Sequence, residues 1–479
     1  MIKLKTMALA TIIATMAAAT CAQAKTDLAN LPSEAMWQEH ANLLGKYWLH
    51  PDALGTPVGN FPTWRCNDGT LRNQKACPPE TSIPKWGREA MQFDFLRMQS
   101  RQTFGYGALY NLTGNPKYLE LHQAGVKHIL SAMDPEGGFK LLFKDGKPVN
   151  EPRLTRTTQD LPYAIIGLAM NAYLTHDPKI IDVIMKTQKY IYDTYYDEKE
   201  GLLRWVLEDF APLNNRKEQL ELVAELDQMN AYLILCWRLV PEAKTQEWSN
   251  VIRRTVDIIN AKFYDKKHNR FQGCIDNESC YDEATGRHMD YGHSCKAFWM
   301  EYLAACGLDD PKLKAFAEKG MLETLNKAFD AENQSWYENV THAPASWWVY
   351  AEFDQAALTL ALEGKYDMPK TLFTWINDRT DKEYGEILSR MKTNLWSSAF
   401  HSTEHALIGS IVSNGIRYAQ CNDDACRNQN KSVLYFAPFD PKVTDFTPYI
   451  YSGKIESIKA KGDGVKVTFK EIAPPKKVK

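Results

Sequence analysis

A short turn recurs along the middle of the chain, and its spacing limits what the sequence can fold into. Each copy places glycine or asparagine a few residues after an aspartate, and a hydrophobic side chain follows. The copies are centred on Asp134, Asp197, Asp265, Asp330 and Asp381, which are 63, 68, 65 and 51 residues apart. Aspartate anchors such turns by bonding to nearby backbone, and glycine or asparagine supplies a positive φ. This period predicts an array of helical hairpins.

Helical patterns fill the intervals between the turns, almost without strand signals. We predict helices over residues 34–49, 88–112, 116–132, 160–175, 178–194, 219–239, 244–263, 289–306, 310–328, 345–363, 380–391 and 400–418. They come in pairs. Six pairs that close on themselves give an all-α (α/α)6 barrel, a toroid of helical hairpins whose inner helices line the core. An open solenoid is the structural alternative.

The two ends of the chain differ from this array. Residues 25–86 combine the first helix with a loop rich in proline and glycine, which we interpret as a rim of the barrel. We assign the barrel itself to residues 87–418. Residues 419–479 comprise a loop and then alternating apolar and polar segments around Gly462-Asp463-Gly464, which predicts a small C-terminal β-hairpin extension.

Residues 1–24 have the features of a cleavable signal peptide. Lys3 and Lys5 precede a short alanine-rich apolar run, and Ala22-Gln23-Ala24 fits a cleavage site. We therefore expect cleavage after Ala24 and export to a periplasm or to the outside of the cell. A lipoprotein anchored through Cys21 is an alternative. No later stretch is suited to a membrane span.

Cysteine usage agrees with export. Six cysteines form three close pairs in polar loops, which we predict to be disulfides: Cys66/Cys77, Cys274/Cys280 and Cys421/Cys426. The remaining three lie in apolar helical stretches and are predicted to be buried thiols: Cys236, Cys295 and Cys306. The pairs lack the CxxC spacing and the nearby histidines of a zinc site.

Bulk composition restricts the partners. Apolar residues make up 44% of the 479 residues and charged residues 24%, as in soluble globular proteins. A net charge of −2 gives no electrostatic attraction for phosphates, so we predict no nucleic-acid partner. Thirteen tryptophans and 23 tyrosines could supply the flat faces that sugars bind. The sequence carries no signal for an oligomeric state.

Two histidines stand out among the eleven in the chain. His293 and Lys296 share one face of an aromatic-rich helix over Met289–Leu303. His401 and His405, four residues apart, open the last long helix. A metal site there would need a third ligand, and we predict no metal and no cofactor. Because His293 and His401 lie nearly two repeats apart, a closed toroid brings both to one cavity as an acid/base pair.

At this point the sequence resembles the N-acylglucosamine 2-epimerase superfamily, which includes cellobiose 2-epimerases and aldose–ketose isomerases. Four pieces carry the resemblance, which covers roughly residues 87–418: Arg101-Gln102-Thr103-Phe104 with Tyr106, Gly292-His293 followed by Trp299, Trp347-Trp348 with Glu352, and Phe400-His401. The resemblance implies an (α/α)6 barrel that binds a carbohydrate. It also implies that His293 and His401 are the catalytic residues.

The chemistry that the resemblance implies uses neither metal nor nucleotide. One histidine removes the proton next to the carbonyl of a ring-opened sugar, and the second returns a proton to the cis-enediolate. Arg101 is the candidate for stabilising the oxyanion. The candidate substrate-binding residues are Arg101, Tyr106, Asn230, Lys296, Trp348, Glu352, Glu404 and His405.

Four residues depart from the family pattern. Lys296 stands where many members have a glutamate, Asn230 stands where many have a histidine, and Glu404 and His405 replace a polar residue. Lys296 could bind an anionic group of the substrate, such as a uronate, and Lys296→Glu should then shift the preference away from anionic sugars. Otherwise the departures indicate altered or lost epimerase chemistry.

Two further functions fit the same barrel. A polysaccharide hydrolase or lyase would need a suitably spaced pair of carboxylates. The sequence offers Asp160, Asp227, Glu352 and Glu404, but it shows no recognisable pair. A non-catalytic carbohydrate-binding protein is the third possibility. We favour an exported sugar epimerase or isomerase that acts on a sugar or oligosaccharide.

Overall fold

Two concentric rings of helices form the body of the protein. The computed structural model describes residues 25–72, 77, 85–150, 156–207, 219–275 and 277–478. The inner ring contains α3 (Leu96–Thr113), α5 (Asp160–Thr175), α7 (Leu222–Gln228) with its continuation through a π-helical turn (Met229–Leu233) into α8 (Ile234–Cys236), α10 (Tyr291–Leu308), α12 (Trp347–Leu362) and α14 (Ala399–Gln420). The outer ring contains α1 (Glu34–Trp48), α4 (Pro116–Ser131), α6 (Pro178–Tyr195), α9 (Glu242–Lys262), α11 (Pro311–Ala328) and α13 (Thr371–Asp378).

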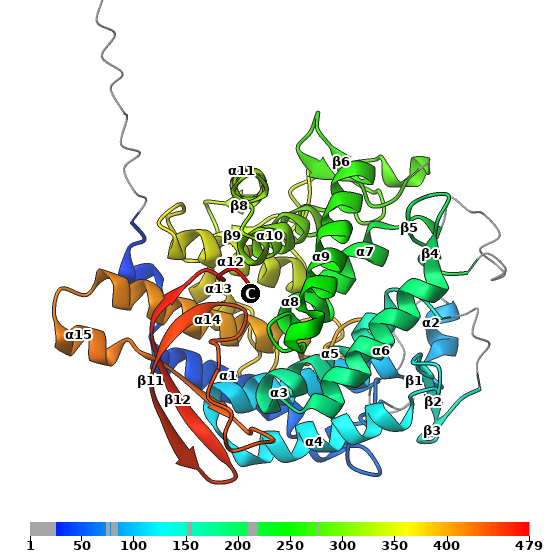
Figure 1. Cartoon of the computed structure of the whole chain (residues 1–479), viewed down its shortest axis with the longest axis horizontal. Coiled ribbons are helices and arrows are strands. Elements are labelled where there is room, and N and C mark those ends of the chain that lie inside the picture. The colour runs from blue at the N-terminus through cyan, green and yellow to red at the C-terminus, as the bar shows by residue number, and fades with distance from the viewer. Residues whose placement is uncertain are drawn as a thin grey trace, which may run out of the picture.

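The inner ring is closed. The last inner helix, α14, packs against both α12 and the first inner helix, α3 (Figure 1). This contact confirms the (α/α)6 barrel and rules out the open solenoid. The first outer helix, α1, also packs on α14 and α3, so the N-terminal helix covers the seam where the ring closes.

Burial separates the two rings. In α5 every residue from Leu161 to Thr175 is buried, whereas α6 buries one face and exposes the other. Three outer helices begin with the same device, a capping side chain followed by proline: Asn115-Pro116, Asp177-Pro178 and Asp310-Pro311. Proline suits the first helical position because its missing N–H would have no partner there.

The predicted aspartate turns join each outer helix to the next inner one. In the second copy, β4 (Tyr196–Asp197) pairs with β5 (Leu202–Leu203), and Asp197 Oδ1 accepts the backbone N–H groups of Lys199 and Glu200. The third and fourth copies form β6 (Tyr264–Asp265) with β7 (Arg270–Phe271), and β8 (Phe329–Asp330) with β9 (Ser335–Trp336). In the fourth copy Gln334, not the predicted Asn333, has the positive φ, while Asn333 donates to Asp330.

One predicted helix is wrong. Residues 380–391 form the fifth aspartate turn, in which Thr380 pairs with Ile387 and Gly385 has a φ of +83°. The outer helix of that hairpin is α13, which ends before the turn. The predicted helix over 88–112 is also divided, into α2 (Lys85–Ala90), β1 (Asp94–Phe95) and α3. β1 pairs with β2 (Leu142–Lys144), which pairs with β3 (Lys147–Pro148).

The C-terminal segment forms a three-stranded antiparallel sheet beside the barrel (Figure 1). The predicted hairpin is present as β11 (Ser452–Lys461) and β12 (Gly464–Ala473) around Gly462-Asp463. β10 (Ser432–Phe436), which the sequence did not reveal, pairs with the other side of β12, and α15 (Asp424–Gln429) precedes it. β12 packs on α14 and β10 on α3, so the sheet covers the C-terminal ends of the inner helices.

The structure contains the three predicted disulfides, Cys66–Cys77, Cys274–Cys280 and Cys421–Cys426. Cys236 and Cys295 are buried free thiols, and Cys306 is partly exposed. Disulfides persist in oxidising compartments, so these bonds are compatible with an extracellular protein. Among the helices of the described residues, none is long and apolar enough to cross a membrane. The predicted signal peptide over 1–24 lies outside those residues.

Candidate active site

The N-terminal ends of the inner helices surround a cavity of about 470 Å³. This volume is in the range of small-molecule sites. The lining residues are Arg101, Gln159, Tyr163, Trp205, Glu221, Asp227, Arg287, His288, Asp290, His293, Lys296, Glu338, Trp347, Trp348, Trp396 and His401. Because alternate helices of a closed toroid run in the same direction, residues from all six inner segments meet at this one mouth.

His293 lies in the first turn of α10 and is held by the residue that caps the helix. Asp290 accepts the backbone N–H of His293 with Oδ1 at 2.9 Å, and its Oδ2 lies 2.6 Å from His293 Nδ1. Burial would raise the pKa of Asp290, but the contacts with His293 outweigh it and the pKa is lowered. An ionised carboxylate at Nδ1 fixes the proton there and leaves Nε2 for a substrate.

His401 lies in the first turn of α14. Its Nδ1 is 3.4 Å from Oε1 of Glu352, a residue of α12 with no exposed surface. Burial, with smaller contributions from Arg101 and Lys296, lowers the pKa of His401 well below its ordinary value. The imidazole is therefore neutral at neutral pH and can accept a proton.

Trp348 connects the two histidines. The ring centroid of Trp348 is 4.7 Å from that of His293 and 6.2 Å from that of His401. Trp347 lies at 5.0 Å from His401. Both imidazoles therefore face one aromatic wall in a single cavity. The sequence-based expectation that a closed ring brings these residues to one cavity agrees with their placement.

Lys296 forms an ion pair at the base of the cavity. Its Nζ is 2.6 Å from Asp227 Oδ1, and the Tyr163 hydroxyl donates to the same oxygen at 3.0 Å. Burial opposes the charge on each partner, but their mutual attraction outweighs it. It raises the pKa of Lys296 above its ordinary value and lowers that of Asp227. The positive charge of Lys296 is therefore already balanced.

Arg101 differs from Lys296 in its surroundings. Its guanidinium carbon lies 4.0 Å from the centroid of the Tyr163 ring, and its Nη1 donates to the backbone carbonyl of Trp396. Among the described residues no carboxylate lies within ion-pair distance of Arg101, whereas the neighbouring Arg97 pairs with Asp160. Arg101 thus brings a positive charge to the cavity without a direct counter-charge.

Five of the predicted substrate-binding residues do not line the cavity. Tyr106 donates to the backbone carbonyl of Trp48 beneath the ring, and His405 Nε2 lies 2.8 Å from Asp354. Glu404 accepts hydrogen bonds within the core, and Asn230 makes a 3.5 Å contact with Tyr163 in the wall. His405 and Glu404 are one turn further along α14 than His401, so they lie deeper in the barrel. Glu352 also lies behind the cavity wall, in contact with His401.

Sequence reasoning missed several lining residues. Asp290 and His288 precede the Gly-His pair. The His288 ring lies 4.6 Å from that of His293, and Arg287 pairs with Glu221. An aspartate three residues before a histidine at a predicted helix start was the available signal for Asp290, because a capping side chain reaches that residue. Glu221 and Arg287 are far apart in the sequence, so no local pattern indicated that they form a pair.

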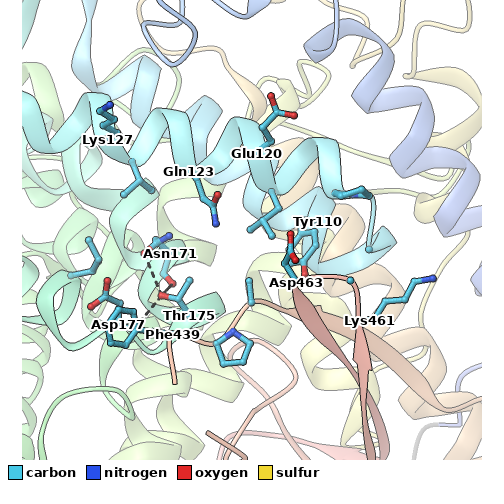
Figure 2. Close-up of a pocket in the computed structure, with 18 of the residues that line it drawn as sticks. Tyr110, Glu120, Gln123, Lys127, Asn171, Thr175, Asp177, Phe439, Lys461 and Asp463 are labelled. Atoms are coloured by element: carbon cyan, nitrogen blue, oxygen red, sulfur yellow. Dashed lines mark hydrogen bonds between the residues drawn. The ribbon is translucent and has the colours of Figure 1, made fainter. Parts of the chain in front are cut away.

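A larger groove lies elsewhere. It has a volume of about 1070 Å³ and runs between α4, the end of α5 and the C-terminal sheet (Figure 2). Its walls carry Gln123, Asn171 and the exposed Phe439, but no histidine. Because the cavity at the helix N-termini brings several histidines together with carboxylates and a groove without histidine does not, the cavity is the candidate active site. Among the described residues, no cluster of His, Cys, Asp or Glu could hold a metal ion.

The closed double ring and its histidine-lined mouth define a barrel protein of the (α/α)6 class. The chain belongs to the N-acylglucosamine 2-epimerase (GlcNAc 2-epimerase) family, which residues 87–386 match. Comparison with curated proteins gave no match.

Solved structures show the same fold at low sequence identity. A sugar epimerase from a ruminal bacterium is 17% identical with a TM-score of 0.60, and the match covers 80% of this chain and 98% of that one. Cellobiose 2-epimerase from Spirochaeta thermophila is 18% identical with a TM-score of 0.55, and the match covers 68% of this chain and 87% of that one. The unsaturated glucuronyl hydrolase from Bacillus sp. GL1 is 9% identical with a TM-score of 0.55, and the match covers 80% of this chain and 97% of that one.

Proposed function

We propose that the protein is an exported sugar epimerase or isomerase in which His293 and His401 transfer protons next to a carbonyl. The observation that supports this most is the placement of both imidazoles against Trp348 in one cavity, each with a carboxyl group at its Nδ1. The hydrogen bond with Asp290 engages Nδ1 of His293, and Glu352 lies beside Nδ1 of His401 without a hydrogen bond, so both Nε2 atoms are left for the substrate. Family membership supports carbohydrate as the substrate class.

The two histidines have different roles in this proposal. Neutral His401 removes the proton from the carbon next to the carbonyl of the ring-opened sugar. The electron pair of that C–H bond becomes the double bond of an enediolate, and the carbonyl oxygen takes the negative charge. His293, whose ring Asp290 holds through Nδ1, gives a proton back. Return to the same carbon from the other face re-forms the carbonyl and is epimerisation. Return to the former carbonyl carbon is isomerisation, in which the proton of the neighbouring hydroxyl also passes to the former carbonyl oxygen as the new C=O forms.

Charge in the cavity favours a neutral sugar over an anionic one. Lys296 and Arg287 are paired with Asp227 and Glu221. Arg101 remains to stabilise the enediolate oxygen, a task in which a preorganised charge in a site sheltered from water is most effective. A uronate would find no second unbalanced cation among the described lining residues, so the idea that Lys296 binds an anionic group loses its support.

Export is the second part of the proposal. Residues 1–24 would be removed after Ala24, which leaves the rim segment 25–86, the barrel 87–418 and the tail 419–479. The three disulfides support maturation in an oxidising compartment.

Proton exchange with solvent tests the function. Incubation with candidate aldoses and reducing disaccharides in D2O should introduce deuterium at the carbon next to the carbonyl, detected by NMR. A polysaccharide that shortens without any exchange would instead indicate a hydrolase or lyase. Sugar binding by calorimetry without turnover would indicate a carbohydrate-binding protein.

Substitution of the histidines tests the mechanism. His293→Ala and His401→Ala should each lower the exchange rate at least about 10²-fold, because each removes a general acid or base. Both should keep the helical circular dichroism of the wild type. His268→Ala, on the Asp265 turn outside the cavity, is the matched control and should keep full activity. Full exchange by either cavity variant would refute the two-histidine mechanism.

A further inference from the structure

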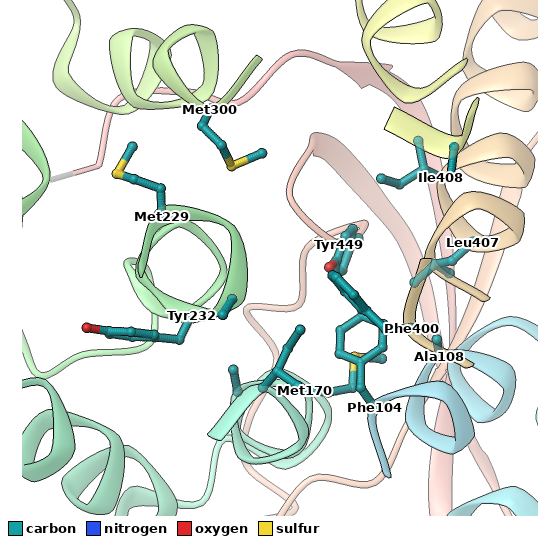
Figure 3. Packing of buried hydrophobic residues seen from close by; sticks show 14 of the residues in the cluster. Phe104, Ala108, Met170, Met229, Tyr232, Met300, Phe400, Leu407, Ile408 and Tyr449 are labelled. Atoms are coloured by element: carbon teal, nitrogen blue, oxygen red, sulfur yellow. The ribbon is translucent and has the colours of Figure 1, made fainter. Parts of the chain in front are cut away.

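Tyr449 reaches into the barrel from the C-terminal segment, which lies beyond the part of the chain that matches the family. Its φ of +57° turns the side chain inward, and its backbone N–H donates to the hydroxyl of Tyr173 at 2.9 Å. The ring is 5% exposed and packs edge-on against Phe104. Figure 3 shows Tyr449 among core side chains that include Phe104 and Phe400. The segment thus inserts a polar group opposite the cavity mouth.

The hydroxyl of Tyr449 has a specific partner. It donates to Glu404 Oε1 at 2.6 Å, and Gln355 Nε2 donates to the other oxygen of Glu404 at 3.1 Å. Glu404 follows His401 by three residues on α14, so both side chains lie on one face of that helix. Two donors on one carboxyl stabilise its ionised form.

Glu352 is the second carboxyl in this region and the one that faces His401. Neither its oxygens nor His401 Nδ1 have a hydrogen-bond partner among the described residues, and Oε1 lies 3.4 Å from Nδ1, close enough for a small rotation of either side chain to form one. Burial raises the pKa of Glu352 to about 7, although Lys296 opposes the shift. Burial and the charge of Glu352 raise the pKa of Glu404 to about 8. The charge of one carboxyl thus opposes ionisation of the other, and between about pH 7 and 8 the two groups together bind about one proton.

The position of that proton decides which nitrogen of His401 can act. If Glu352 is ionised, Nδ1–H donates to it and Nε2 is a free base toward the cavity. If Glu352 is protonated, its O–H donates to Nδ1, and the neutral ring carries its proton on Nε2 and cannot accept another there.

We propose that Tyr449 is a positioning residue for His401, because its hydrogen bond to Glu404 controls how the Glu404–Glu352 pair divides its charge and hence which tautomer His401 adopts. The tail is then part of the catalytic apparatus. The catalytic consequence rests on the proposed function, but the tautomer does not.

Other groups face the carboxyl pair from the elements packed around it. From α10 these are Lys296, His293 and the Cys295 thiol, from α7 Asp227, and from the tail Tyr451. Arg101 of α3 acts on His401 itself, Tyr163 of α5 interacts with Asp227 and Lys296, and Tyr173 of α5 interacts with Tyr449. Lys296 attracts the negative charge toward Glu352, whereas Tyr449 and Gln355 hold it on Glu404. Removing Tyr449 therefore moves charge toward Glu352.

Two variants and a matched control test the proposal. Tyr449→Phe removes the donor, and Glu404→Gln removes the competing charge. The control is Tyr451→Phe, which removes a buried hydroxyl of the same segment that bonds to Thr359 at 2.8 Å instead of to a carboxyl. Imidazole ¹⁵N NMR between pH 5 and 9, with the His401 signals assigned by their loss in His401→Ala, reports the tautomer without any substrate.

Tyr449→Phe and Glu404→Gln should both move the midpoint of the tautomer change to lower pH, by about half a unit to one unit. The acidic limb of the exchange rate should move with it. Tyr451→Phe should leave both unchanged. An unmoved tautomer midpoint in Tyr449→Phe, or an equal shift in Tyr451→Phe, would overturn the proposal. Absence of exchange by the wild type, with the tautomer shift present, would refute the proposed function and leave the coupling intact.

Discussion

Lys296 Nζ and Asp227 Oδ1 lie 2.6 Å apart inside the barrel, with side chains only 4% and 2% exposed. The sequence presented Lys296 as a free cation that could bind an anionic sugar. The structure shows that its charge is balanced by a carboxylate on another inner helix. A buried pair of this kind stabilises little as a pair, but each partner depends strongly on the other.

Removing the lysine alone should therefore be costly. Lys296→Met leaves the Asp227 carboxylate buried without its counter-charge, and we expect a loss of about 3–5 kcal/mol in the free energy of unfolding. Lys296→Glu should be at least as destabilising, which replaces the earlier expectation of a changed sugar preference. The double variant Lys296→Met/Asp227→Leu should recover much of the loss. Chemical denaturation measures all three, and a Lys296→Met protein of wild-type stability would contradict the ion pair.

Asp290→Asn should impair catalysis with little effect on stability. Asparagine caps a helix as well as aspartate does, so α10 keeps its N-terminus. The amide removes the negative charge that lies 2.6 Å from His293 Nδ1, and we expect kcat to fall about 10²-fold while KM changes little. Thermal unfolding should remain within a few degrees of the wild type. A large drop in melting temperature with unchanged kcat would show that Asp290 is only a cap.

The sequence predicted the elements that depend on local patterns. The range 160–175 matches α5 because its apolar residues, buried on all sides, are bounded by turn and capping residues. The predicted helix over 380–391 was wrong, because the charged stretch around Gly385 has no apolar face that would distinguish a helix from a turn. The repeat alone was enough to predict that the imidazoles of His293 and His401 face one cavity. The Asp227 partner of Lys296 and the Glu221 partner of Arg287 could not, because these contacts exist only after the ring has closed.

Glu404 should make the protein less stable as pH rises. Its pKa is raised from an ordinary value of 4.5 to about 8, chiefly by burial, so the folded protein binds its proton more tightly than the unfolded chain does. That contribution to stability is complete below about pH 4.5 and is lost as pH rises toward 8. The difference in melting temperature, Glu404→Gln minus wild type, should therefore become more positive as the pH is raised from 5 to 9. Glu120→Gln, at a well-exposed position of α4, should show no such trend.

The Cys274–Cys280 disulfide should matter for substrate binding more than for folding. It closes a short loop, for which chain entropy predicts about 2 kcal/mol of stabilisation. The Cys421–Cys426 loop is of nearly the same length, with a sequence separation of 5 against 6, so both double alanine variants should lose similar stability. Of these two loops, only the one closed by Cys274–Cys280 leads to Arg287 and His288 in the cavity wall. This loop is also bound next to the start of α7, because the Ile275 N–H donates to the Leu220 carbonyl at 3.0 Å. Cys274→Ala/Cys280→Ala should therefore raise KM several-fold with kcat nearly unchanged, because the proposed proton-transfer residues, His293 and His401, lie on α10 and α14. Cys421→Ala/Cys426→Ala should leave both constants at the wild-type values, and an equal rise in KM in both variants would mean that the effect comes from lowered stability instead of from the cavity wall.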